Sequence, residues 1–413
     1  MNDRDAVAWL YRHAGFGLAA GELASAVGRG PQAEVQRLVR AATGAAADDA
    51  WDDSRLPYDP KDQSAGQYAI GAWLSSLIVS TDPLRDWMAW FWHGRFVSAL
   101  DKVRVARLVV DQIRLFRSAG LGDFSSLLKA VTVDPAMLIY LDGGLSTVKA
   151  PNENYGREVM ELFTLGVGNY TEDDVKAAAR ALTGYRMRPQ SQTAKFVPKN
   201  HDDQPQHYLG ASGVHDVDTV VGALVEHPAL PMFIAGKLSA AILGTTDGAV
   251  VAPLADAFVE SSLNIAALVS ATLSAGIAGA GREVVLAPVP WFVIASRVTA
   301  AIVPIKQALG GLRAAAQVPM LPPNVAGWPG GQAWFASGTV VARANLAMAI
   351  AAAAPEDNPA MMAATSGDLD ALGDALGMIS PTFAAASMKA LDTAKAPRQR
   401  LALALISPEF VVS

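Results

Sequence analysis

The sequence predicts an all-α protein, a multi-helical globular bundle with long proline- and glycine-rich loops. Apolar residues recur at helical spacing through most of the 413 residues. Many of these stretches begin directly after Ser, Thr, Asp or Pro, which favour the first turn of a helix. Val and Ile alternate with polar residues over no convincing length, as a half-buried strand would require. Helices are therefore expected to form nearly all of the regular structure.

The predicted helices follow one another along the whole chain. They span residues 3–13, 19–27, 31–42, 65–79, 82–98, 100–118, 122–130, 134–140, 152–165, 171–183, 216–226, 230–242, 248–258, 263–276, 288–308, 339–353, 368–377, 381–391 and 396–406. Strands are expected only at 194–197 and 284–287. Two segments, 186–214 and 318–338, hold too many prolines, glycines or polar residues for helix, and loops this long in a compact domain are often functional.

Residues 1–353 are expected to form the main helical domain, which carries every motif described below. Residues 354–366 read as a linker before a small C-terminal helical piece, and the whole segment 354–413 is expected to pack on that domain. A chain of this length with 51% hydrophobic residues can bury a substantial core.

Charge and composition exclude several classes of function. The net charge of −6 and the lack of long Lys/Arg runs argue against a nucleic-acid partner. The chain has no cysteine, which excludes disulfides, thiolate catalysis and cysteine metal sites. No signal-peptide pattern opens the sequence, and the uncharged stretch 263–280 is diluted by Ser, Thr and Gly. We therefore expect a cytoplasmic protein with no membrane or nucleic-acid partner.

The segment 152–165 concentrates charge in a chain that is only 17% charged. At about 100° per residue, five of its polar side chains fall in one arc opposite an apolar stripe. They are Glu153, Asn154, Arg157, Glu158 and Glu161. Such an arc is ordinarily a solvated helix face. Its neighbourhood, with a second helix opening at Thr171 after a short glycine-bearing loop, makes a functional role a competing interpretation.

Residues 87–96 gather three tryptophans, two phenylalanines, one histidine and one arginine within ten positions. Tryptophan offers a large apolar face with a polar N–H, and arginine stacks on such faces. An aromatic core helix explains the segment equally well. His93 is followed by Gly94 and Arg95, which favours an open or contacted surface there.

Three other segments carry candidate residues. His201 and Asp202 are adjacent in the first long loop, and both types bind metals or transfer protons, although such pairs also arise by chance. Prolines and glycines make 322–334 a rigid loop that presents Trp328 and Trp334. That loop is either a sugar or aromatic platform or a cap on the bundle. Residues 12–17 read mainly as a helix C-terminus capped by a glycine.

The order and spacing of seven motifs resemble the bacterial family called domain of unknown function 1800, over essentially the whole chain. The motifs are Arg12-His-Ala-Gly-Phe-Gly, Phe91-Trp-His-Gly-Arg-Phe, Asp134-Pro-Ala-Met-Leu-Ile-Tyr-Leu-Asp142, Asn152-Glu-Asn-Tyr-Gly-Arg-Glu, Gly168-Asn-Tyr-Thr-Glu-Asp-Asp-Val, His201-Asp and Pro322-Pro-Asn-Val-Ala-Gly-Trp-Pro-Gly-Gly. The resemblance implies a largely helical fold and no settled activity.

The chain departs from the family pattern at three points. Arg95 stands where the family usually has a second histidine, so a metal ligand supplied by that histidine would be missing here. Gly156 stands where alanine is common, a change that costs about 1 kcal/mol of helix propensity and allows close approach to the helix. Many relatives also carry export signals, for which this sequence shows no pattern.

These segments lead to a hypothesis of one cleft lined by the polar arc, His93 and the His201-Asp202 pair. In the favoured chemistry, a hydrolase of the glycosidase type acts on a small-molecule or polysaccharide ligand without a cofactor. Glu158 is the expected catalytic carboxylate, with Glu153 or Asp202 as its partner and Arg157 holding the partner ionised. The expected substrate-binding residues are His93, Arg95, Asn154, Arg157, Glu161, His201, Trp92, Trp328 and Trp334.

Two alternatives stay open. In the first, a divalent metal is held by His93, Glu158, Glu161 and His201, because Glu residues at i and i+3 can reach one ion. In the second, the protein is a non-enzymatic helical scaffold or binding protein, and the polar arc is a buried network that ties the helical hairpin to the loops.

Overall fold

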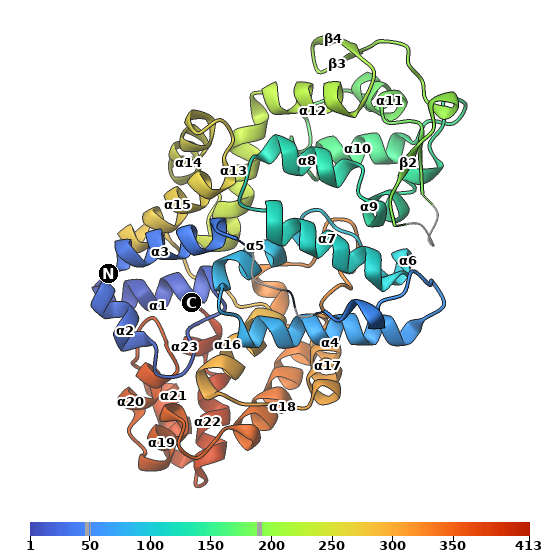
Figure 1. Ribbon diagram of the computed structural model, residues 1–413. Coiled ribbons are helices and arrows are strands. Elements are labelled where there is room, and N and C mark those ends of the chain that lie inside the picture. The colour runs from blue at the N-terminus through green and yellow to red at the C-terminus, as the bar shows by residue number, and fades with distance from the viewer. Residues whose placement is uncertain (46–48, 50, 188–191) are drawn as a thin grey trace.

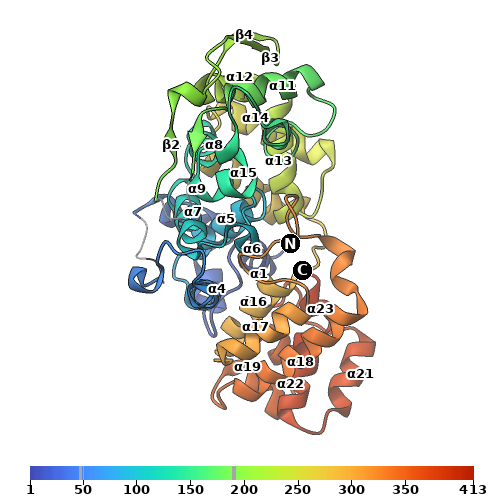
Figure 2. The same ribbon diagram turned by 90° about the vertical axis from the view of Figure 1, so that its right-hand side faces the viewer.

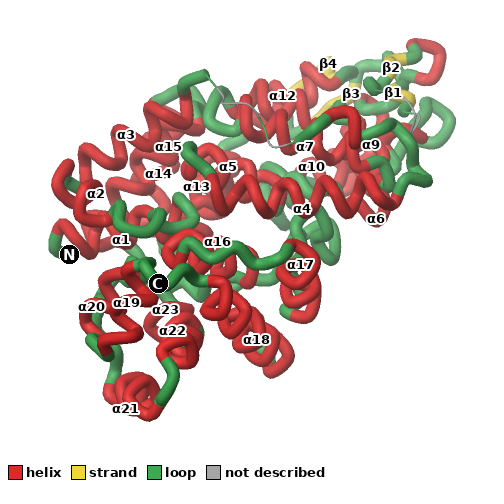
Figure 3. Tube along the Cα trace, turned by 60° about the horizontal axis from the view of Figure 1, so that its bottom comes forward, coloured by secondary structure: helices red, strands yellow, loops and turns green. Residues whose placement is uncertain are grey.

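The computed structural model of the protein describes residues 1–45, 49, 51–187 and 192–413. Helices dominate this part of the chain, and the only sheets among the described residues are two small two-stranded ones. The predicted all-α fold is confirmed. Figure 3 shows helices throughout and the strands gathered at one end of the molecule.

The helices cover the chain from end to end. Those of the first third are α1 (Asp3–Ala14), α2 (Leu23–Arg29), α3 (Pro31–Thr43), α4 (Gln63–Val79), α5 (Pro83–His93), α6 (Leu100–Val103), α7 (Ala106–Ala119), α8 (Phe124–Thr132) and α9 (Pro135–Tyr140). Those of the middle are α10 (Glu153–Glu161), α11 (Glu172–Ala181), α12 (Val217–Glu226), α13 (Ala229–Ile242), α14 (Gly248–Glu260) and α15 (Ile265–Ala275). Those of the last third are α16 (Pro288–Thr299), α17 (Ile305–Ala314), α18 (Ser337–Ala353), α19 (Pro359–Ser366), α20 (Leu369–Ala375), α21 (Ala385–Thr393), α22 (Pro397–Leu405) and α23 (Pro408–Val411).

The four strands form two separate antiparallel pairs. Strand β1 (Tyr185–Arg186) pairs with β2 (Lys195–Phe196), and β3 (Gln206–Tyr208) pairs with β4 (Ala211–Val214). The predicted strand at 194–197 is thus present in shortened form, whereas 284–287 makes only an isolated bridge between Val285 and Val412. The predicted loop 186–214 contains a β-hairpin that the sequence did not indicate, and its residues 188–191 lie outside the described residues.

The helices are arranged along an elongated body (Figures 1 and 2). Helices α8 to α15 and both sheets lie at one end, and α16 to α23 lie at the other. Helices α1, α5 and α7 lie between them. The two chain ends lie close together in both views. The predicted boundary at 353/354 stays a prediction, and α18 packs on α22 across it. The predicted linker 354–366 is wrong over its second part, because Asn358 caps helix α19, which spans Pro359–Ser366.

Local signals place several of the predicted helix ends. Asn152 caps α10 by accepting from the Tyr155 amide, and Thr171 and Asp174 form a capping box at the predicted start of α11. Gly156 brings α10 and α11 together, since a Cβ there would lie 2.8 Å from the Val175 carbonyl oxygen. The close approach expected at this glycine is therefore present.

Several predicted helices are shorter or divided in the structure, and three of them illustrate why. The stretch 100–118 breaks into α6 and α7 where Arg104 adopts a left-handed conformation. The stretch 288–308 breaks into α16 and α17, because Ala300 is left-handed and Pro304 follows it. Helix α5 ends at His93, since the chain turns at Gly94. In each case a backbone conformation, invisible in the apolar periodicity, ends the helix.

The predicted helix at 263–276 was the stretch to test as a membrane span. Among the described residues, no single helix is both long and apolar enough to cross a membrane. Only α12 and α13 taken together reach the required length and composition, and these two helices meet at 79°.

Candidate functional site

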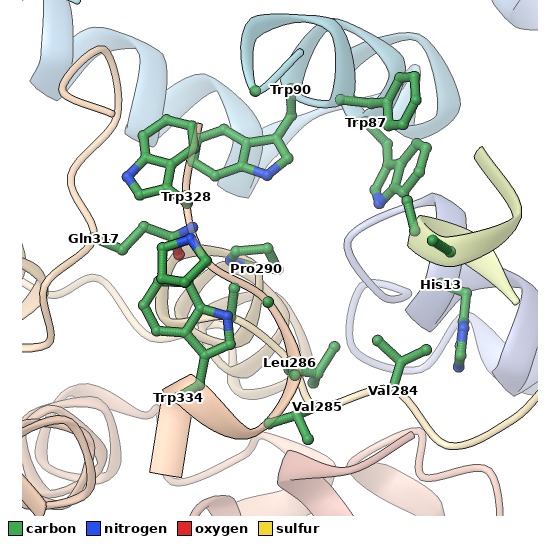
Figure 4. Close-up of a pocket in the computed structure, with 18 of the residues that line it drawn as sticks. His13, Trp87, Trp90, Val284, Val285, Leu286, Pro290, Gln317, Trp328 and Trp334 are labelled. Carbon is green, nitrogen blue, oxygen red and sulfur yellow. The ribbon is translucent and has the colours of Figure 1, made fainter. Parts of the chain in front are cut away.

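A pocket of about 420 Å³ opens in the middle of the molecule (Figure 4). It lies between the C-terminal turn of α1, helix α5, the end of α13, the segment 284–290 and the loop 317–334. Its polar and aromatic lining residues include Arg12, His13, Trp87, Trp90, Arg95, Gln317, Trp328 and Trp334. Its volume lies in the range of small-molecule sites.

Tryptophans from two distant segments form one wall of this pocket. The rings of Trp90 and Trp328 stack with centroids 4.9 Å apart and an interplanar angle of 11°. Trp87 lies on the same helix as Trp90, and Trp334 faces the space from the loop (Figure 4). The aromatic segment and the rigid loop, both singled out in the sequence, therefore converge on the same pocket.

A glycine allows the loop to close on helix α5. Gly327 has a φ of +87°, and a Cβ there would overlap the carbonyl oxygen of Gly94. Only glycine combines this backbone conformation with so close an approach. The next residue is Trp328, so the contact sets where its indole ring lies.

Two arginines, Arg12 and Arg95, line the pocket, and neither forms an ion pair with the described residues. Arg12 is buried, and its Nη2 donates to the Phe410 carbonyl while Nε and Nη1 have no partner among the described residues. Burial lowers the pKa of Arg12 to about 9. Arg95 is partly exposed and lies over the Phe91 ring at 5.7 Å, and burial lowers its pKa as well. No Asp or Glu side chain lines the pocket.

His13 lies at the opposite end of the pocket from the stacked tryptophans (Figure 4). It is buried, and its Nδ1 lies 2.6 Å from the Ile242 carbonyl oxygen, so Nδ1 carries the hydrogen. Burial lowers the pKa of His13 to about 4, which keeps the ring neutral near pH 7 and leaves Nε2 as an acceptor.

The polar arc of α10 lies outside this pocket. Arg157 makes a bidentate ion pair with Glu172 of α11, at 2.8 and 2.7 Å, and not with the carboxylates of its own helix. The hydrogen bond with Glu172 raises the pKa of Arg157. Glu161 accepts from the Tyr170 hydroxyl. The expectation that Arg157 serves its own helix's carboxylates is therefore wrong: it ties the hairpin together.

The three glutamates of the arc differ in burial. Glu153 and its neighbour Asn154 are exposed, whereas Glu158 and Glu161 are half-buried. Burial, and then the charge of Glu161, raises the pKa of Glu158. Glu158 is thus more buried than Glu153, as its place at the edge of the apolar stripe predicts.

His201 and Asp202 fasten the long loop to the end of α11. Asp202 is buried and accepts from Arg180 at 2.6 Å, and its own amide donates to Thr183. The His201 Nδ1 donates to the Thr183 carbonyl at 2.9 Å. Burial alone would raise the pKa of Asp202, but the Arg180 hydrogen bond lowers it below its usual range. The described contacts of this pair are those of a loop anchor.

His93 and Trp92 belong to the core. His93 is fully buried between Trp73 and Trp328, with ring centroids 5.1 and 5.5 Å away, and neither ring nitrogen has a partner among the described residues. The open surface expected around this histidine is therefore wrong. Trp92 points elsewhere and donates to the Gly120 carbonyl at 2.7 Å.

The described structure does not bring the predicted metal ligands together. Across residues 1–45, 49, 51–187 and 192–413, no group of three or more His, Asp or Glu side chains lies close enough to hold an ion. His93 makes no polar contact there, while Glu161 and His201 are bonded to Tyr170 and Thr183. The four proposed ligands are thus not gathered.

The predicted cleft is therefore only partly assembled. Arg95, Trp328 and Trp334 line the pocket. His93 does not line it but packs against the Trp328 ring. The polar arc, the His201-Asp202 pair and Trp92 do not line it. Sequence reasoning missed Gln317 and the pocket role of Arg12 and His13. The only signal for the last two was a motif that reads first as a helix end.

The fold and the pocket together define an all-α protein with an aromatic pocket that two arginines line. The chain matches, over residues 9–412, the model of the family described as Protein of unknown function (DUF1800). It belongs to that family, as the seven motifs implied. No curated protein and no solved structure matches the chain.

Proposed function

We propose that this protein binds a carbohydrate-like ligand in the pocket between α5 and the loop 317–334. The observation that carries the proposal is the stacked pair of Trp90 and Trp328, which presents an aromatic platform inside a cavity of about 420 Å³. The apolar C–H face of a sugar ring packs on an indole face, while polar side chains fix its hydroxyl groups.

Gln317 supports the same proposal. Its Oε1 accepts from the Val289 amide at 2.8 Å, which fixes the orientation of the side chain. The Nε2 group makes no hydrogen bond with the described residues, so it is free to donate to a ligand oxygen. One fixed donor beside an aromatic platform is the usual composition of a small-molecule site.

A fluorescence screen tests this function. We expect members of a panel of mono- and oligosaccharides to quench tryptophan emission of the wild-type protein. Trp328→Ala should weaken the tightest interaction by about tenfold or more, because it removes half of the platform. Trp328→Phe should restore part of it.

Phe335→Ala is the matched control, since this aromatic side chain lies in the same loop, is 46% exposed and does not line the pocket. It should leave binding unchanged. A panel in which no saccharide responds, or a response that Trp328→Ala leaves intact, would contradict the proposal.

A second candidate is the carboxylate hydrolase that the sequence suggests. The observation that favours it is Glu158, a half-buried carboxyl group whose pKa is raised by burial and by Glu161. A raised pKa is what a general acid needs near neutral pH. Glu153 and Asp202 stay the proposed partners, the first exposed and the second already held by Arg180.

Substitution of Glu158 distinguishes the hydrolase from the non-enzymatic scaffold. Glu158→Gln should reduce hydrolysis of aryl glycosides or polysaccharides by about a hundredfold or more if the carboxyl group transfers a proton. Tyr170→Phe, which loses the hydrogen bond to Glu161 and keeps both carboxyl groups, serves as the structural comparison. Unchanged activity in Glu158→Gln would remove its catalytic role. A lower melting temperature without any effect on activity or ligand binding would favour the non-enzymatic scaffold.

A further inference from the structure

Two arginines line the pocket without an ion pair to any described Asp or Glu side chain. The Arg95 side chain makes no ion pair or hydrogen bond with the described residues, and the Arg12 side chain donates only to the Phe410 carbonyl group. Arg12 is only 3% exposed. A cation withdrawn from water without a counter-charge costs several kcal/mol. Such a group in a pocket points to a ligand that supplies the missing charge.

A third cation lies near Arg95. The Lys237 side chain, on α13 one turn before the lining residue Ala240, is half-buried and packs on the Phe233 ring at 4.9 Å. Burial, and then the charge of Arg95, lowers the pKa of Lys237. The two cations repel each other, and an anion bound at Arg95 would relieve that repulsion.

The polar groups that face the pocket are mostly donors. The Arg95 guanidinium and the Gln317 Nε2 are donors without described partners, whereas the Nε2 acceptor of neutral His13 is buried. The complementary ligand is therefore rich in acceptor oxygens. Arginine binds carboxylate, sulfate and phosphate through paired N–H groups, which fixes their orientation as well as their charge.

We propose that the ligand is an acidic saccharide, whose oxyanion group binds Arg95 beside Lys237 while its ring lies on Trp328. The proposal rests on the proposed function, because the ring needs the tryptophan platform. It adds the chemical class of the ligand. The oxyanion is a carboxylate, a sulfate ester or a phosphate ester, and all three present the same acceptor geometry to a guanidinium group.

The test measures thermal stability and tryptophan emission at constant ionic strength. Four probes share one sugar ring: glucose, glucuronate, glucose 6-sulfate and glucose 6-phosphate. Inorganic sulfate is added as a fifth probe without a ring. We expect at least one acidic sugar to bind about tenfold more tightly than glucose, and Arg95→Gln to remove that preference.

Two further variants make the result specific. Arg95→Lys keeps the charge and should retain part of the preference, whereas Arg313→Gln removes an exposed arginine outside the pocket and should change nothing. Because Arg95 makes no polar contact with the described residues, its replacement is not expected to unfold the protein.

The outcomes are distinguishable. Equal binding of glucose and all acidic sugars overturns the acidic-ligand proposal and leaves the sugar-binding function standing. A sulfate response that Arg95→Gln abolishes, with no response to any sugar, supports the anion subsite and overturns the proposed function. Sulfate and sugars that act equally on wild type and Arg95→Gln overturn the subsite altogether.

Discussion

Replacing Gly327 with alanine should lower the free energy of unfolding by about 3 kcal/mol and abolish ligand binding in the pocket. The new Cβ would overlap the Gly94 carbonyl oxygen, and the φ of +87° disfavours any side chain. The loop would have to move away from α5 and take Trp328 with it. Thermal unfolding and tryptophan emission measure the two effects.

Gly330→Ala is the control for this substitution. Gly330 lies three residues further along the same loop, has an extended backbone with φ −127°, and a Cβ there would meet nothing within 4 Å. Its unfolding free energy should stay within about 0.5 kcal/mol of wild type. If Gly327→Ala and Gly330→Ala behave alike, the contact between the loop and α5 does not shape the pocket.

Replacing His93 with phenylalanine should protect the protein against acid. Burial lowers the pKa of His93 to about 3, from an ordinary value of about 6.5. As the pH falls below 6.5, His93 of the unfolded chain takes up a proton, whereas His93 of the folded protein stays neutral. The wild-type protein therefore loses the stability that it has above that pH. The loss should reach about 3 kcal/mol near pH 4.5 and cease below the folded pKa.

The measurement is the difference in melting temperature between His93→Phe and wild type across this pH range. This difference in melting temperature should increase steadily as the pH is lowered from 7. Asp134 acts in the opposite direction, because burial raises its pKa to about 7, but it is common to both proteins and cancels. His207→Phe, at an exposed histidine, should follow the wild-type profile. A difference that stays constant with pH would show that His93 titrates normally in the fold.

Local signals predict most of the fold and part of the site. Helix periodicity and caps such as Asn152 or the Thr171–Asp174 box depend on neighbouring residues, so they can be read from the sequence. The Trp328 loop could likewise be found, because prolines and glycines cluster with aromatic residues. Helix breaks at Arg104 and Ala300 carry no such signal.

The predictions that were wrong concern side chains whose partners lie far away in the sequence. Arg157 is predicted to hold Glu153 or Asp202 ionised, but it pairs with Glu172 of the next helix. His93 was expected near a surface, yet Trp73 and the distant Trp328 enclose it. Periodicity cannot rank a partner within one helix against one brought close by folding. The pocket's cations were missed for the same reason, since an unpaired arginine looks like any other in sequence.

Nuclear magnetic resonance of the indole N–H groups tests the central claim most directly. The chain has nine tryptophans, and Trp87, Trp90, Trp328 and Trp334 line the pocket. With the signals assigned by single substitutions, a hydrolysate of uronate-bearing polysaccharides should shift those four and leave Trp51 in place. Shifts confined to tryptophans outside the pocket, or none at all, would contradict the account.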